Sequence, residues 1–284
     1  METWFIHSLI GVVAIGIMMA LFKVPVAKGH NKYAYSFLSL LVATLLAGIL
    51  FKNSVHFNST VILFASMWGA LYALLSMLQM QMLKRLDTNA LFPITSLGSH
   101  TLVVILGITF FHDKMSPLQG IGVIATFLLV GFYNYNHKHI TFRNGLLGGA
   151  IGIVLLSALS KFIQKFAAIS VELNNFIFWQ LFFATIAAFL ILIVAERKDL
   201  KQGMRFNAGI VMWGALLGVL NFVGTTEITT ALSTGPFSLT YTINCFYILI
   251  TSLVAWRFFG EKLTRQKIIF IFLSIGTIIM IGLG

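Results

Sequence analysis

Long uninterrupted runs of apolar residues dominate the sequence. A membrane-spanning helix needs about 20 mostly apolar residues, and ten runs approach or exceed that length. They lie near residues 4–26, 33–51, 60–83, 90–111, 117–135, 145–169, 174–195, 208–231, 236–259 and 265–283. The runs are continuous, whereas barrel strands are short and alternate between polar and apolar residues. The sequence therefore predicts an all-α integral membrane protein of ten transmembrane helices joined by short loops.

Two short motifs recur at nearly the same spacing, which indicates an internal repeat. Met67–Leu71 reads MWGAL and recurs unchanged as Met212–Leu216, at an offset of 145 residues. Phe110–Ser116 reads FFHDKMS and is paralleled by Phe258–Thr264, which reads FFGEKLT, at an offset of 148 residues. In both cases the two copies fall at the same place in a group of five predicted helices.

We therefore expect two homologous halves of five helices each, residues 1–139 and residues 140–284. Because five is an odd number, two tandem halves must lie in the membrane with opposite orientations. Such inverted repeats are typical of transporters, in which the two halves surround a site near the middle of the bilayer.

The composition supports this architecture and excludes several classes of protein. Hydrophobic residues make up 58% of the chain and charged residues 10%, whereas soluble domains average about 25% charged residues. This balance excludes a soluble enzyme, a secreted disulfide scaffold and a disordered segment. The single cysteine, Cys245, lies in an apolar run and cannot form an internal disulfide.

The net charge of +11 comes from Lys and Arg gathered at the ends of the apolar runs. No basic stretch is long or interleaved with aromatic residues, so we expect no nucleic-acid partner. Most of the basic residues flank the loops after the first, third, fifth, seventh and ninth helices. The positive-inside rule places these loops in the cytoplasm and both termini outside.

Polar residues within the spans are candidates for a substrate site, because such residues usually face the bundle interior or a water-filled cavity. The fourth span carries Ser96, Ser99 and His100, and the ninth carries Tyr241 and Asn244. These two spans occupy equivalent places in the two halves, so we expect their polar faces to line one shared cavity. The alternative is that these side chains only hydrogen bond to neighbouring helices.

The third and eighth spans form a second matched pair. The third span carries Tyr72, Ser76 and Gln79 near one stripe, and the eighth carries Trp213 and Asn221. Large aromatic side chains in such a place can form a wall for an organic substrate. Simple packing, or anchoring at the membrane interface, is the alternative.

Three of the ionisable side chains inside predicted spans are candidates for the site. The imidazole of His100 is suited to bind substrate or carry a proton, although a neutral core histidine is the alternative. Lys161 favours a carboxylate or phosphate on the substrate if it faces the cavity, and otherwise it snorkels to the headgroups. Glu227 is a candidate for ion coupling or amine binding, or Lys161 and Glu227 neutralise each other. No His, Cys or carboxylate cluster has ligand spacing, so we expect no metal and no cofactor.

With two five-helix halves and an acidic-basic motif after the fourth helix of each, the chain resembles the drug/metabolite transporter superfamily, in particular its EamA-like ten-helix members. Phe259–Thr264 (FGEKLT) is similar to the GE(R/K)L(S/T) signature of these proteins. His112–Ser116 looks like a diverged copy, with His in place of Gly and Asp in place of Glu. We expect Asp113 and Glu261 to cap helices at the interface and not to touch substrate.

The resemblance implies an alternating-access carrier with a central cavity lined by helices 1, 3, 4, 6, 8 and 9. It also implies that both termini are cytoplasmic, which opposes the charge count and leaves the orientation open. The small multidrug resistance proteins of the superfamily carry a glutamate in the first helix for proton coupling. The first and sixth spans lack a mid-span acidic residue here, which argues against drug/proton antiport of that type.

The sequence therefore predicts a secondary active or facilitative transporter of small organic metabolites, for example amino acids or related zwitterions and anions. We expect it to work as an exporter in a bacterial-type cytoplasmic (inner) membrane, as a monomer or homodimer. A lipid-flipping protein or a non-transporting partner subunit is the alternative. An enzyme is not expected, since no nucleophile–base pair or paired carboxylates are present. The absence of a G-x-x-x-x-G-K-[ST] loop excludes an ATP-driven pump for this chain alone.

Overall fold

The computed structural model describes residues 2–21, 32–83, 88–134, 146–195, 208–260 and 265–284. Within these residues the chain forms helices and no strands, so the predicted all-α class is confirmed. The helices are α1 (Thr3–Leu21), α3 (Lys32–Leu50), α4 (Ser59–Leu83), α5 (Thr88–Thr109), α6 (Pro117–Asn134), α7 (Leu146–Ser170), α8 (Leu173–Ala195), α9 (Ala208–Thr234), α10 (Phe237–Asn244), α11 (Tyr247–Phe259) and α12 (Arg265–Leu283).

The helices are long and apolar enough for a multi-pass membrane protein. In the described part of the chain, seven segments qualify as candidate spans by length and composition, and three shorter apolar helices accompany them. The seven are Thr3–Leu21, Tyr33–Leu50, Leu147–Ser170, Leu173–Ala195, Ala208–Thr234, Phe237–Phe258 and Arg265–Leu283. Helical structure is the physical consequence of apolar sequence in lipid, because a helix satisfies its own backbone hydrogen bonds.

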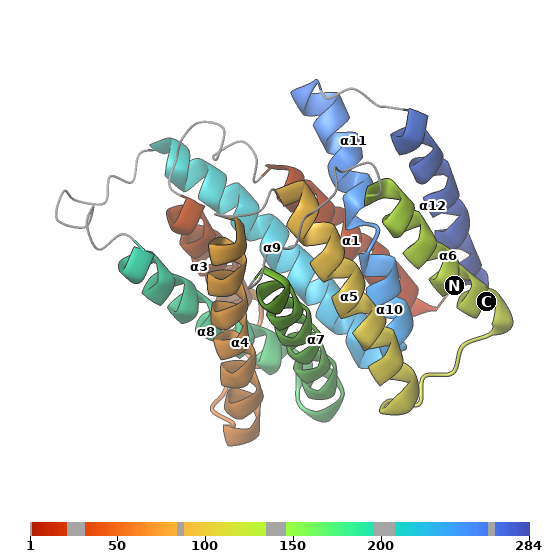
Figure 1. The fold of residues 1–284 in the computed structure, drawn as a ribbon. Coiled ribbons are helices and arrows are strands. Elements are labelled where there is room, and N and C mark those ends of the chain that lie inside the picture. The colour runs from red at the N-terminus through yellow and green to blue at the C-terminus, as the bar shows by residue number, and fades with distance from the viewer. Residues whose placement is uncertain (1, 22–31, 84–87, 135–145, 196–207, 261–264) are drawn as a thin grey trace.

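Helices from the two parts of the chain interleave in the bundle (Figure 1). Helix α1 packs against α9 and α11, and α7 packs against α4 and α5. Helix α3 lies between α8 and α9, α4 packs against α8, and α6 packs against α12. Each helix of residues 1–139 therefore packs mainly against helices of residues 140–284. Each helix of residues 140–284 likewise packs mainly against helices of residues 1–139.

Small residues allow α1 and α9 to approach closely. A Cβ added at Gly11 would lie 2.8 Å from Ile228, and one added at Gly224 would lie 2.8 Å from Ile15. Close backbone approach at small residues is the usual way in which membrane helices gain packing energy, since apolar burial gives little driving force in lipid. The two contacts, one from each helix, fix how α1 lies against α9.

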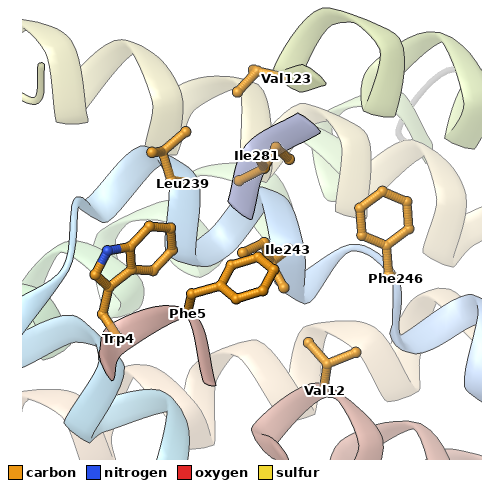
Figure 2. Close-up of a cluster of buried hydrophobic side chains, with 8 residues drawn as sticks. All are labelled: Trp4, Phe5, Val12, Val123, Leu239, Ile243, Phe246 and Ile281. Carbon is orange, nitrogen blue, oxygen red and sulfur yellow. The ribbon is translucent and has the colours of Figure 1, made fainter. Parts of the chain in front are cut away.

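A buried apolar cluster joins the first helix to the last (Figure 2). Its members come from α1, α6, α10, α12 and the segment after α10, and they are Trp4, Phe5, Val12, Val123, Leu239, Ile243, Phe246 and Ile281. The two termini lie at the same end of the bundle (Figure 1), where Phe5 packs against Gly282. We call this end of the molecule the terminal face; it also contains residues 110–116, 171–172 and 235–236.

The ninth predicted helix, expected to be continuous over residues 236–259, is broken in the structure. Helix α10 ends at Asn244, and α11 begins at Tyr247. Between them the Phe246 N–H donates to Ile243 O over 2.9 Å, an i→i+3 bond that tightens the turn. The local sequence, rich in Thr with an Asn at the end, has low helix propensity. A helix end therefore lies inside the apolar segment Phe237–Phe258.

Candidate functional site

Polar side chains from α5, α7 and α10 meet around Lys161. Its Nζ donates to Ser99 Oγ over 2.9 Å and lies 3.4 Å from His100 Nε2. The same Nζ lies 5.3 Å from the centroid of the Tyr241 ring. We call Ser96, Ser99, His100, Lys161 and Tyr241 the Lys161 cluster. The structure thus brings together five residues, from three helices, that were predicted for the site from the sequence.

The hydrogen bonds of His100 define its tautomer. His100 is 4% exposed, and its Nδ1 lies 2.6 Å from the carbonyl oxygen of Ser96. A carbonyl can only accept, so Nδ1 carries the proton. The lone pair of Nε2 then faces the Lys161 ammonium, which donates. His100 is therefore a neutral imidazole that holds the lysine in place.

A chain of amides and hydroxyls supports the cluster from behind. The Tyr241 hydroxyl donates to Gln164 Oε1 over 2.9 Å, and Gln164 Nε2 donates to Thr229 Oγ1 over 2.8 Å. Gln180 Nε2 also reaches Thr229 Oγ1, at 3.4 Å. Gln164, Gln180 and Thr229 were not among the residues predicted for the site. For Gln164 the available signal was its position three residues after Lys161, which places both on one face of α7.

Two polar atoms of α10 are buried without a hydrogen-bond partner in the described part of the chain, namely Thr240 Oγ1 and Asn244 Oδ1. The two residues are four apart and share a helix face. Buried polar atoms in proteins normally have partners. These two atoms, near the C-terminal end of α10, are therefore unsatisfied within the described residues.

The structure places three other predicted residues in packing contacts and not in the Lys161 cluster. The Tyr72 ring stacks on Trp68 with centroids 5.7 Å apart. Trp213 packs on an apolar group with Met18 and Leu217. Asn221 Nδ2 reaches Ser39 Oγ at 3.4 Å, which links α9 to α3.

Two further candidates, Ser76 and Gln79, lie on α4, but their side chains are outside the described residues. Their predicted role is therefore neither supported nor opposed by the geometry.

Glu227 pairs with a histidine across the α1–α9 contact. Its Oε2 lies 2.6 Å from His7 Nδ1, and both side chains are partly exposed. The ion pairs of the described residues do not join Glu227 to Lys161. The considered alternative, that Lys161 and Glu227 neutralise each other, is therefore not what the structure shows.

A second lysine of α7 has a different environment. Lys165 is 7% exposed, and its Nζ donates to the carbonyl oxygens of Leu232 and Gly235 over 2.7 and 2.9 Å. These carbonyls lie at the C-terminal end of α9, where helix carbonyls lack intrahelical partners and a cation is favourable. Lys165 thereby joins α7 to the end of α9 on the terminal face.

The motif after α5 caps α10. Asp113 Oδ2 accepts hydrogen bonds from the backbone N–H and the hydroxyl of Ser238, both over 2.7 Å. A carboxylate that binds the N–H groups at a helix start stabilises that helix. The expected capping role is confirmed for Asp113; Glu261, its counterpart, lies outside the described residues.

The two motifs share an unusual backbone angle. His112 has φ of 53° and Gly260 has φ of 66°, and both follow the end of a helix. This left-handed region is a common helix end and favours glycine. His112 stands where the second copy of the motif has Gly260.

Aromatic rings fill the space between Lys165 and Asp113. The Phe111 ring lies 5.4 Å from Phe162 and 5.1 Å from Phe237, centroid to centroid. The polar bonds of Lys165 and Asp113 and these three rings together link α7, α9, α10 and the segment after α5 at the terminal face. In the described part of the chain, no group of three or more His, Cys, Asp or Glu could hold a metal ion.

These features define the class of the protein as a multi-pass helical membrane protein with a polar cluster where α5, α7 and α10 meet. Comparison with known proteins gives the family. Residues 143–283 match the EamA-like transporter family. One solved structure, titled only "Crystal structure of protein", aligns over 98% of this chain and 98% of its own, with a TM-score of 0.77 and 11% identity. At this identity the match shows a shared fold. No curated protein sequence matches the chain.

The chain belongs to the EamA-like transporter family of the drug/metabolite transporter superfamily. It is therefore a multi-pass membrane protein of a family that transports small molecules.

Proposed function

We propose that this protein carries small organic metabolites across the membrane by alternating access, and that the Lys161 cluster is its substrate site. The observation that carries the proposal is the position of the cluster. Ser99 and His100 come from α5 in the first half, whereas Lys161 and Tyr241 come from the second half. A solute bound there contacts both halves, and its binding depends on how they are placed.

The proposed architecture is ten transmembrane helices in two inverted halves, residues 1–139 and 140–284. The packing of α1 against α9 and α11 mirrors the packing of α7 against α4 and α5. The left-handed backbone at both His112 and Gly260 adds a second correspondence. Inverted halves around a central site are a recurrent transporter design.

The proposed mechanism is a rocking of the halves that opens and closes the terminal face. We propose that the closed state of this face is held by the bonds of Lys165 and Asp113 and by the packed rings of Phe111, Phe162 and Phe237. We further propose export as the direction and an inner membrane as the location, following the family resemblance. The roles suggested for Tyr72, Ser76, Gln79, Trp213, Asn221 and Glu227 remain proposals for the walls of the solute path.

The proposal is tested by combining ligand screening with transport. Purified protein is screened by thermal shift against metabolites of several classes, because a ligand of the folded state raises the apparent stability. Compounds that bind are then loaded into proteoliposomes. We expect at least one class to bind and be transported, with both signals lost in Lys161→Ala and His100→Ala.

Lys52→Ala serves as the matched control, since Lys52 is an exposed lysine away from the cluster. Normal transport by the Lys161 and His100 variants would show that the site lies elsewhere. A protein that binds and moves only lipids would instead be a flippase, and the metabolite carrier would be rejected.

A further inference from the structure

We infer that the substrate of this site carries an anionic oxygen group, such as a carboxylate or phosphate, which binds at the Lys161 ammonium. The inference rests on the proposed function and names the chemical class of its solute. Its basis is that the described groups in contact with Lys161 include no negatively charged one.

The described contacts of Lys161 leave its charge without a counter-charge. Its hydrogen-bond partners are the Ser99 hydroxyl and the neutral imidazole of His100. Among the described residues, the ion pairs join His7 to Glu227 and His56 to Glu172, and none reaches Lys161. The Tyr241 ring, whose centroid lies 5.3 Å from Nζ, is also neutral, so these contacts supply no counter-charge.

The Asp113 carboxylate is already engaged by α10. Asp113 accepts two hydrogen bonds from Ser238 at the start of α10, and it belongs to the closed terminal face. Charged groups buried in proteins are normally paired, because removing an ion from water is costly. A solute anion supplies the partner that the described part of the protein does not.

The first experiment compares compounds of one size and different charge. Glycerate, glycerol 3-phosphate, glycerol and serinol share a three-carbon skeleton and carry a carboxylate, a phosphate, no charge and an amine. They are screened by thermal shift against the full-length protein, together with larger metabolites of the same four classes. We expect stabilisation only by compounds with an anionic group. Comparison of glycerate with glycerol 3-phosphate then shows whether the site binds a carboxylate or a phosphate.

Variants of Lys161 separate a binding role from a structural one. In Lys161→Gln the stabilisation by anions should fall at least tenfold in apparent affinity, and Lys161→Arg should retain a measurable part of it. The melting temperature without ligand should stay the same or rise in Lys161→Gln, because an uncompensated charge is removed. Lys52→Gln, at an exposed site, should change neither the apparent affinity for anions nor the melting temperature.

Several outcomes would overturn the inference. Neutral or amine compounds that bind and are transported equally by wild type and Lys161→Gln would reject the anion site but leave the carrier function intact. A lower melting temperature in Lys161→Gln with unchanged anion binding would make Lys161 a structural residue. If no class binds and none is transported, the proposed function fails together with the inference.

Discussion

His112 occupies a backbone conformation that its counterpart in the second motif reaches with a glycine. Its φ of 53° and the φ of 66° at Gly260 both lie in the left-handed region. For a residue with a Cβ this region costs about 1–2 kcal/mol. His112 therefore stores strain at the junction that holds Asp113 against α10, whereas Gly260 does not.

Replacing His112 with glycine should stabilise the protein. We expect His112→Gly to add about 1 kcal/mol, seen as a higher melting temperature of the purified protein. Gly260→Ala is the reciprocal control and should lower the melting temperature by a similar amount. If His112→Gly lowers it instead, the imidazole makes contacts that outweigh the strain.

The two lysines of α7 lie one turn apart and should respond in opposite ways to the same substitution. Lys165→Met leaves the carbonyls of Leu232 and Gly235 without their donor. Since a hydrogen bond from a charged group contributes about 1.5–3 kcal/mol, the melting temperature should fall clearly. Lys161→Met removes an uncompensated charge and should leave the melting temperature unchanged or higher. Equal losses in both variants would contradict the different roles assigned to them.

At the scale of the helix, α10 depends on a cap supplied from the first half of the chain. Asp113→Ala removes the acceptor for the N–H and hydroxyl of Ser238. Loss of such a cap costs about 0.5–2 kcal/mol, so we expect reduced thermal stability. Asp113→Asn keeps an oxygen acceptor and should lose less. Identical effects of the two substitutions would mean that the carboxylate charge, and not the cap, is what matters.

Helix positions followed from the sequence, whereas the break between α10 and α11 did not. Apolar length and the repeat of MWGAL identify the helical segments because burial in lipid depends on composition. The break depends on a single turn at Cys245 and Phe246, and hydropathy is the same for a continuous and a broken helix. Low helix propensity in TYTINC was the available signal, but propensity is often overridden by packing.

The candidate site was also only partly predictable from the sequence. Ser99, His100 and Lys161 could be chosen individually because polar residues in spans are costly. Their meeting required the crossing of α5 and α7, which a single sequence does not fix. Tyr72 and Trp213 fit the same sequence pattern but lie in packing contacts, because aromatic side chains serve both purposes.

For the whole molecule, the single cysteine offers a test of alternating access. Cys245 is 1% exposed at the helix break, and its thiol donates to the carbonyl oxygen of Tyr241, a residue of the Lys161 cluster, over 3.6 Å. In the proposed mechanism, Lys165, Asp113 and the rings around Phe111 close the terminal face between this thiol and water. If this face is a gate, loosening it should expose Cys245 to reagents from that side without any other change in the protein.

We expect a membrane-impermeant methanethiosulfonate reagent, added to the terminal face of reconstituted protein, to label wild-type Cys245 slowly. Labelling should be at least several-fold faster in Lys165→Met and Asp113→Ala, because each removes a bond that closes this face. Cys245→Ser controls for labelling at other sites, and a transported anion should change the wild-type rate by shifting the population of closed states. Equal rates in wild type and both variants would show that these contacts do not gate the path, and the site would then open only toward the other face.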